Sequence, residues 1–303
     1  MTDKQDPNDE IRSMSRKFEA ITTTDRNSNS HDGPGGNSPS VINVRTSRNH
    51  EEVRQTADGL SLSLQRVRKD IPERIIFVVD TVRETDCTPF EIGSGAKFPP
   101  LHMIKRVIEI FISAKGSISK KHEYAIMKLT DESCQWVCDF TDNPKTLVNQ
   151  LDRIEEVQVE ENSRRCDLTA CFQLIDDRVE LEWSSKEPRS LTRVVLIYSR
   201  SHCIPDFSDS RSFTALMENP HFFTDVVYVH EKVNEGNECE EVYTKLGELD
   251  VKQNSYIFEV ARNPANLHNT MAKLLAHPLQ RPKQDDTSYV PQCLEDTDVQ
   301  TNV

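Results

Sequence analysis

Three features are absent from the sequence, and each absence excludes a class of protein. No apolar run approaches the roughly 18–20 residues that a membrane span needs. The N-terminus, Met-Thr-Asp-Lys-Gln-Asp, lacks the apolar segment of a secretory signal. There is no glycine-rich phosphate loop of the Walker or Rossmann kind. We therefore expect neither a membrane protein, nor an exported one, nor a nucleotide-binding enzyme built on those loops.

Positive charge is also scarce. The chain carries 37 lysines and arginines against 50 acidic residues, which gives a formal net charge of −13. This balance argues against general binding to the phosphate backbone, so we expect no nucleic-acid partner.

The eight cysteines contain no C-x-x-C pair, and their spacing does not suit a tetrahedral Cys/His zinc site. In a chain without an export signal they are most simply free thiols of a cytosolic or nuclear protein. The positions are 87, 134, 138, 166, 171, 203, 239 and 293.

Both ends of the chain are poor in apolar residues. Residues 1–70 are rich in Ser, Asn and Asp, and residues beyond Pro282 are polar and acidic. Hydrophobic residues make up only 36% of the chain, so we expect disordered tails around one folded domain. The predicted division is a tail at 1–70, a domain at 71–277 and a C-terminal segment at 278–303.

The central region begins with an uninterrupted apolar run, Ile75–Val79, that ends on Asp80. A strand that is apolar on both faces is typical of a parallel sheet covered by helices. Trp136, Cys138 and Phe140 alternate with other residues, which predicts an antiparallel edge strand with one drier face. Further strands are expected at Tyr124–Leu129, Val194–Tyr198, Val226–Val229 and Tyr256–Val260.

Helical patterns separate these strands. Apolar residues between Pro100 and Lys115 recur with helical spacing, and Gly116 suits the C′ position of that helix. Asn-Pro pairs predict helix starts, with Asn as N-cap and Pro at N1. The remaining helices are expected after Asn143-Pro144, after a cap at Asp167, at Phe213–Met217, at Val242–Leu249, and from Asn263-Pro264 to Pro278. The alternation predicts a doubly wound, mostly parallel α/β sheet with an antiparallel edge hairpin.

This pattern resembles a von Willebrand factor A domain, in which the first strand also ends on Asp. Over roughly residues 70–282 the chain resembles a narrower family, the von Willebrand A-like scaffold subunits of the BRISC and breast-cancer-susceptibility-protein A deubiquitinase complexes. The runs that carry the likeness are Arg74–Asp80, Val194–Arg200, Phe222–His230 and, most specifically, Met271–Pro282.

The resemblance implies a non-catalytic subunit that maintains a complex specific for lysine-sixty-three-linked ubiquitin, in the DNA-damage response and cytoplasmic signalling. Its direct partner would be a subunit built of UEV domains, which are inactive relatives of ubiquitin-conjugating enzymes. A zinc deubiquitinase of the JAMM type and its Abraxas-type pseudo-enzyme partner would belong to the same complex. The implied compartments are the cytoplasm and the nucleus, and we predict no enzyme activity and no cofactor of the chain's own.

The metal site of von Willebrand A domains is expected to be vestigial here. Metal-binding members use Asp-x-Ser-x-Ser after the first strand, a Thr from a later loop and an Asp after another strand, whose oxygens suit Mg²⁺. In this chain Val82 and Glu84 stand at the two hydroxyl positions, and Arg200 falls near the last Asp. Only Asp80 and Thr169 remain, so we expect Asp80 to be hydrogen-bonded or paired with an arginine. The alternative function left open is a metal-dependent ligand-binding von Willebrand A domain.

The segment Pro278-Leu279-Gln280-Arg281-Pro282 is the predicted partner-binding site. Its two prolines favour an extended, pre-ordered backbone, and Arg281 offers a planar fork of donors. The resemblance implies docking in a UEV-domain groove. From the residues alone, the favoured interpretation is a helix stop that leads into a linker.

No motif gives the remaining histidines and cysteines a catalytic role. His221 and His230 flank a predicted strand, whereas His268 and His277 lie on the last predicted helix, and no motif pairs them with a nucleophile. Cys166 lies near a helix start, where the pKa of a thiol can fall, so a cysteine hydrolase is a third hypothesis. Without a recognisable base, we expect core thiols instead.

Overall fold

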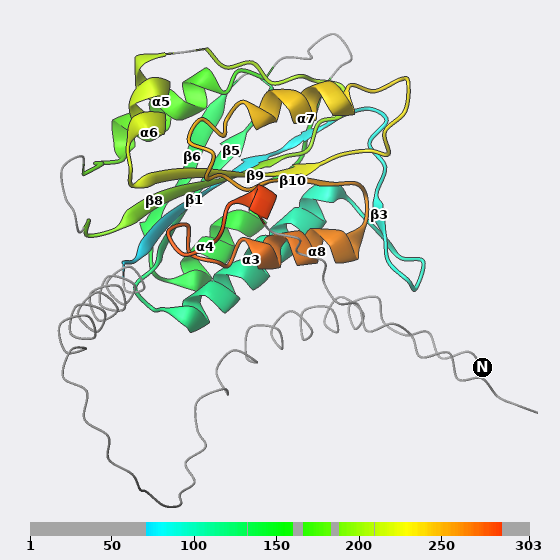
Figure 1. Cartoon of the computed structure of the whole chain (residues 1–303). Coiled ribbons are helices and arrows are strands. Elements are labelled where there is room, and N and C mark those ends of the chain that lie inside the picture. The colour runs from blue at the N-terminus through cyan, green and yellow to red at the C-terminus, as the bar shows by residue number, and fades with distance from the viewer. Residues whose placement is uncertain (1–70, 132, 160–165, 183–187, 209, 287–303) are drawn as a thin grey trace, which may run out of the picture.

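The computed structural model describes residues 71–131, 133–159, 166–182, 188–208 and 210–286. The predicted tails at 1–70 and 287–303 lie outside these residues. The main sheet has six strands, which follow the spatial order β10-β9-β8-β1-β5-β6 (Figure 1). Neighbouring strands are parallel except β5 and β6, which are antiparallel. This confirms the doubly wound prediction. The strands are β1 (Glu73–Asp80), β5 (Glu123–Leu129), β6 (Cys134–Thr141), β8 (Leu191–Tyr198), β9 (Phe222–Val229) and β10 (Ile257–Val260).

Helices cover both faces of the sheet (Figure 1). On one face lie α3 (Pro100–Ile118), α4 (Pro144–Asp152) and α8 (Pro264–Lys273), and on the other α5 (Thr169–Arg178), α6 (Arg211–Glu218) and α7 (Cys239–Gly247). Alternate residues of β1 point to opposite faces of the sheet. Phe77 packs in the core under α3, α4 and α8, and Val78 packs in the core under α5–α7; both are 0% exposed. This two-sided burial is why the strand is apolar without interruption. The short elements are β2 (Val82–Arg83), β3 (Phe90–Glu91), β4 (Lys97–Phe98), β7 (Val157–Gln158) and η1 (Gln284–Asp286).

The predicted Asn-Pro helix starts are confirmed. The Asn143 side chain accepts a hydrogen bond from the Lys145 N–H, and Asn263 accepts one from Asn266. Asp167 accepts from the Thr169 N–H at 2.8 Å, although the N-cap residue of α5 is Leu168. Within the described residues, no helix is long and apolar enough to cross a membrane.

Two predicted helix ends are wrong. Gly116 does not end its helix: it lies inside α3, which continues to Ile118. Gly116 also lacks the positive φ of a C′ glycine, since Gly95 is the one described glycine with positive φ. α8 ends at Lys273, capped by Leu274, so His277 lies beyond the helix and Pro278 does not stop it.

The drier face predicted for β6 is also only partly correct. Trp136 and Phe140 pack against the core under α5–α7, whereas Cys138 belongs to the core under α3, α4 and α8. The β5–β6 pairing shifts register on both sides of Ile126. A bulge of this kind moves the following side chains to the opposite face, which a strict period of two does not allow for.

The folded body extends past residue 277. The Tyr256 hydroxyl donates to the Pro282 carbonyl at 2.9 Å, and the Gln284 amide both accepts from the Ile257 N–H (2.7 Å) and donates to its carbonyl (2.8 Å). Residues 278–286 are therefore attached to β10, and the predicted boundary at 277 does not separate them from the domain.

Candidate functional site

Asp80 ends β1 at the edge of the sheet where ligands bind in this class of fold. Its carboxylate accepts from the Arg200 Nε at 3.1 Å and Nη2 at 3.0 Å, and from the Ser199 N–H at 3.1 Å. Both side chains are buried, with exposed fractions of 0% for Asp80 and 2% for Arg200. Burial is the largest influence on the pKa of Arg200 and lowers it, but attraction to Asp80, the hydrogen bond to Asp80 and the neighbouring Cys166 and Tyr198 together outweigh burial, so the pKa is raised. The buried ion pair lies at the end of the central strand.

The two positions that carry hydroxyls in metal-binding relatives have other tasks. The Val82 N–H donates to Asp80 at 3.2 Å, while its side chain is buried. The Glu84 carboxylate accepts from the N–H groups of Ser201 (2.6 Å) and His202 (2.8 Å). Burial raises the pKa of Glu84 despite these two hydrogen bonds, which lower it. Glu84 thus binds the loop after β1 to the loop after β8.

The site does not suit a magnesium ion. The Thr169 hydroxyl accepts from the Ser208 N–H at 3.0 Å, and Thr169 is not among the hydrogen-bond partners of Asp80. Within the described residues, no group of three or more His, Cys, Asp or Glu side chains could hold a metal. Mg²⁺ needs six oxygens in octahedral geometry, and here the Asp80 carboxylate already faces a guanidinium.

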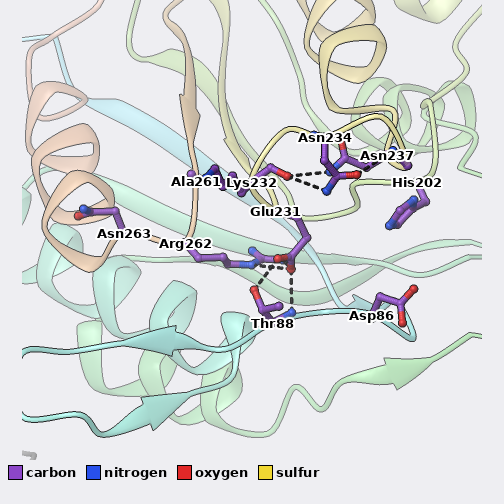
Figure 2. Close-up of a pocket in the computed structure, with 11 residues that line it drawn as sticks. Asp86, Thr88, His202, Glu231, Lys232, Asn234, Asn237, Ala261, Arg262 and Asn263 are labelled. Carbon is purple, nitrogen blue, oxygen red and sulfur yellow. Dashed lines mark hydrogen bonds and ion pairs between the residues drawn. The ribbon is translucent and has the colours of Figure 1, made fainter.

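A pocket of about 700 Å³ adjoins this cluster, lined by the loops that follow β1, β8, β9 and β10. Figure 2 shows the Glu231 carboxylate between Thr88 and Arg262, with Asp86 and His202 to one side. The Thr88 N–H donates to Glu231 at 2.8 Å, and Arg262 donates to it at 3.0 Å. The lining has no serine or cysteine beside His202. These contacts build a polar surface at the ends of the strands.

A second charged cluster lies at the opposite ends of the strands. Glu73 starts β1 and bonds Lys115 of α3 at 2.5 Å and Arg193 of β8 at 3.2 Å. Arg193 also bonds Asp225 of β9 at 2.6 Å, and Asp225 accepts from Arg281 Nη1 at 2.8 Å. All five side chains are at most 2% exposed. Burial raises the pKa of Glu73 and of Asp225, but the adjacent cations outweigh it, so the pKa of each carboxyl is lowered.

The sequence analysis missed most of this cluster. A signal was present, because Arg193 and Asp225 interrupt apolar strands that are buried on both faces, and Lys115 lies in the apolar stripe of α3. A charge at such a position requires a buried partner.

The structure corrects the expectation for the C-terminal segment. Residues 278–280 form a turn instead of an extended strand, with the Gln280 N–H bonded to the His277 carbonyl at 2.9 Å. Arg281 does not offer a free fork. Besides Asp225 it binds the Asn254 carbonyl at 2.9 Å, and its guanidinium lies 3.9 Å from the Tyr256 ring centroid. Pro278 is buried and Leu279 half-buried, so Gln280 and Pro282 are the exposed residues.

The described cysteines are all free thiols, as predicted. Cys166 is 3% exposed and Cys171 2%, and burial raises the pKa of the Cys166 thiol. The pKa of Cys171 is raised by a hydrogen bond to Cys134 and by burial. The expected core thiols are confirmed, and the thiolate that a cysteine hydrolase needs is disfavoured.

Two buried histidines are held neutral. Burial, with a smaller contribution from the positive charge of Lys115, lowers the pKa of His122 to about 4. The His122 Nδ1 accepts a hydrogen bond from the Glu73 N–H at 3.0 Å. Burial and Arg106 lower the pKa of His268 to about 4. His277 lies beyond α8, where its Nε2 bonds the Ile71 carbonyl at 3.2 Å. The hydrogen bonds of His122 and His277 give these two side chains structural tasks.

The His122 contact predicts a pH-dependent stability. An unfolded histidine titrates near 6.5, whereas His122 in the fold titrates at about 4, so the unfolded chain binds a proton first and stability falls from pH 6.5 towards 4. We expect His122→Gln to remove about 2 kcal/mol of the loss between pH 7 and 5, measured by urea unfolding at both values. His202→Gln is the control, and equal pH dependence of the His122→Gln and wild-type chains would contradict the prediction.

Solved structures and family models add little to this description. No family model matches the chain. A structure described as the SpRpn10 VWA domain is 11% identical, with a TM-score of 0.42, and the match covers 66% of this chain and 93% of that one.

Curated relatives are more informative. A protein named BRISC and BRCA1-A complex member 1 from Pongo abelii is 34% identical over 251 residues, which cover 80% of this chain and 74% of the relative. The human protein of that name is 34% identical over 237 residues, covering 75% of this chain and 70% of the relative. The residues compared include most of the folded domain, and the identity extends well beyond any one motif. The chain therefore belongs to the family of BRISC and BRCA1-A complex member 1.

Proposed function

We propose that this protein is a non-catalytic scaffold subunit of a deubiquitinase complex specific for lysine-sixty-three-linked ubiquitin. Family membership supports the assembly, since the relatives are named as complex members and not for an activity. The observation that carries the non-catalytic, metal-free role is the buried Asp80–Arg200 pair, in which a guanidinium faces the carboxylate that the resemblance to von Willebrand A domains implies as a metal ligand. The proposal also assigns the protein to the cytoplasm and the nucleus.

The chemistry of the described residues supports the same role. Cys166 and Cys171 are buried thiols of raised pKa, and the lining of the pocket beside Glu231 contains no serine or cysteine. In this proposal ubiquitin hydrolysis belongs to a zinc subunit of the JAMM type, which pairs with an Abraxas-type pseudo-enzyme. The chain described here holds the assembly together.

The direct partner in this proposal is the UEV-domain subunit, which docks on Pro278–Pro282. The turn geometry changes how the segment is presented. Because the Arg281 side chain is 1% exposed, it anchors the segment to Asp225, and the partner meets Gln280 and Pro282 instead. A segment held rigid before binding loses less conformational entropy on docking.

A double substitution tests this contact without disturbing the anchor. Gln280→Ala/Pro282→Ala leaves Arg281 and the Pro282 carbonyl in place, so we expect an unchanged melting temperature and at least tenfold weaker binding to the purified UEV-domain subunit. Tenfold corresponds to about 1.4 kcal/mol. The measurement is titration calorimetry, with Gln135→Ala on β6 as the control.

The two possible failures are distinguishable. If the wild-type chain does not bind the UEV-domain subunit, the proposed partner is wrong. If the double variant binds as tightly as the wild type, the scaffold role stands but Pro278–Pro282 is not its anchor.

A further inference from the structure

A groove of about 470 Å³ lies between the C-terminal half of α3 and the start of α4, on the helical face that also carries α8 (Figure 1). Its apolar lining comes from Ile112, Pro144 and Val148. Ile112 is fully buried, Val148 half-buried and Pro144 exposed, so apolar surface runs from the floor to the rim. A depression of this size accommodates one or two side chains of another protein.

The rim of this groove is positively charged. Lys120 and Lys145 are exposed, and neither ammonium group forms an ion pair or hydrogen bond with another described residue. The acid in the lining, Glu109, is bound to Arg106 at 2.5 Å. In a chain of net charge −13, two lysines that form no ion pair with another described residue, beside an apolar groove, are complementary to an acidic ligand.

Gly116 lies in the same groove, inside α3. A Cβ atom added there would meet no atom within 4 Å, so the packing of the described domain does not require glycine. Glycine inside a helix is unfavourable relative to other residues. The open space beside Gly116 is available to an incoming chain.

We propose that the α3–α4 groove is a second docking site, which takes an acidic segment of another subunit of the complex. An apolar side chain of that segment rests on Ile112 and Val148, and flanking carboxylates meet Lys120 and Lys145. The inference rests on the proposed function, because the occupant is a neighbouring subunit. It is separate from Pro278–Pro282, which lies on the β10 side of the domain, whereas α4 contacts β6 at the opposite edge of the sheet.

Zero-length cross-linking tests whether Lys120 and Lys145 pair with carboxylates of another subunit. A carbodiimide couples an ammonium group to a carboxylate only when the two are in contact. We expect the assembled complex, treated in this way, to yield peptides that join Lys120 or Lys145 to an Asp or Glu of another subunit. Lys97 is the comparison residue, since it is exposed but pairs with Glu91 within the domain.

A pair of glycine substitutions tests the groove itself. Gly116→Gln fills the open space, and because it replaces glycine in a helix we expect an equal or higher melting temperature. Gly247→Gln is the matched control, since Gly247 ends α7 on the other face and a Cβ there also meets nothing. In competition for a limiting amount of the other subunits, we expect the Gly116→Gln chain to be incorporated at least tenfold less well than the Gly247→Gln chain.

Each outcome decides the proposal. Cross-links to another subunit together with selective loss in Gly116→Gln support it. A complex that assembles with neither effect overturns the groove and leaves the scaffold role intact. Cross-links from Lys120 or Lys145 only to acids of residues 285–303 would show that the chain's own C-terminus fills the groove, which overturns an intersubunit site. Failure of the wild-type chain to assemble overturns both proposals.

Discussion

Asp225→Asn should lower the free energy of unfolding by about 3–5 kcal/mol, although it only replaces one carboxylate oxygen with an amide nitrogen. The reason is the charge of the cluster around it. Three cations (Lys115, Arg193 and Arg281) surround two carboxylates (Glu73 and Asp225), and all five side chains are at most 2% exposed. Removing one carboxylate charge leaves Arg193 and Arg281 buried beside a neutral amide, and burying an uncompensated charge is costly.

The measurement is urea unfolding at neutral pH, with Asp177→Asn on the exposed side of α5 as the control, expected to change stability by at most about 0.5 kcal/mol. Combining Asp225→Asn with Arg281→Met removes a carboxylate and a cation together. The double variant should lose less than the sum of the single losses. Additive losses would show that the two side chains do not act as a pair, and a loss below about 1 kcal/mol for Asp225→Asn would contradict the buried cluster.

Arg200→Met, at the carboxyl ends of the strands, should also lower the free energy of unfolding by about 3–5 kcal/mol. The reason is that it leaves the Asp80 carboxylate buried without its cation. The loss includes the Arg200 hydrogen bond to the Thr130 carbonyl at 2.8 Å. Arg200→Lys keeps the charge but not the planar fork that contacts both Asp80 oxygens, so we expect a smaller loss.

The same chains test for magnesium. We expect no change in the melting temperature of the wild-type protein in millimolar Mg²⁺, because a ligand stabilises a fold only if it binds it. Arg200→Met should not respond either, since Val82 and Glu84 supply no hydroxyl groups. A clear rise in the wild-type melting temperature with Mg²⁺ would support the alternative, a metal-dependent ligand-binding domain, against the scaffold proposal.

The fold was readable from sequence where burial leaves a regular pattern. β1, β8 and β9 are continuous apolar runs because helices cover both faces of the sheet. The helix starts at Asn143 and Asn263 were readable because capping is a local interaction. The prediction that Trp136, Cys138 and Phe140 share one face of β6 was wrong, because a bulge in β6 depends on the partner strand.

The candidate sites were less predictable, because their contacts join distant parts of the chain. Asp80 ends β1 and Arg200 closely follows β8, so their positions at the carboxyl ends of the strands could be predicted from the pattern. Arg281 was misread as an available donor, since nothing in the local Pro-x-x-Arg sequence indicates an Asp225 that lies 56 residues away. The contact of the Thr169 hydroxyl with the Ser208 N–H likewise joins two loops, and the local sequence does not indicate it.

The Gln284 side chain has a consequence for solubility. Its amide donates to and accepts from Ile257 at the outer edge of β10, as the backbone of an added strand would. Exposed strand edges invite pairing with other chains, and proteins commonly cover them to avoid aggregation. A single glutamine side chain thus occupies a pairing position of this edge. Proteolysis just before Gln284 would expose β10 to strand addition and favour self-association of an otherwise intact domain.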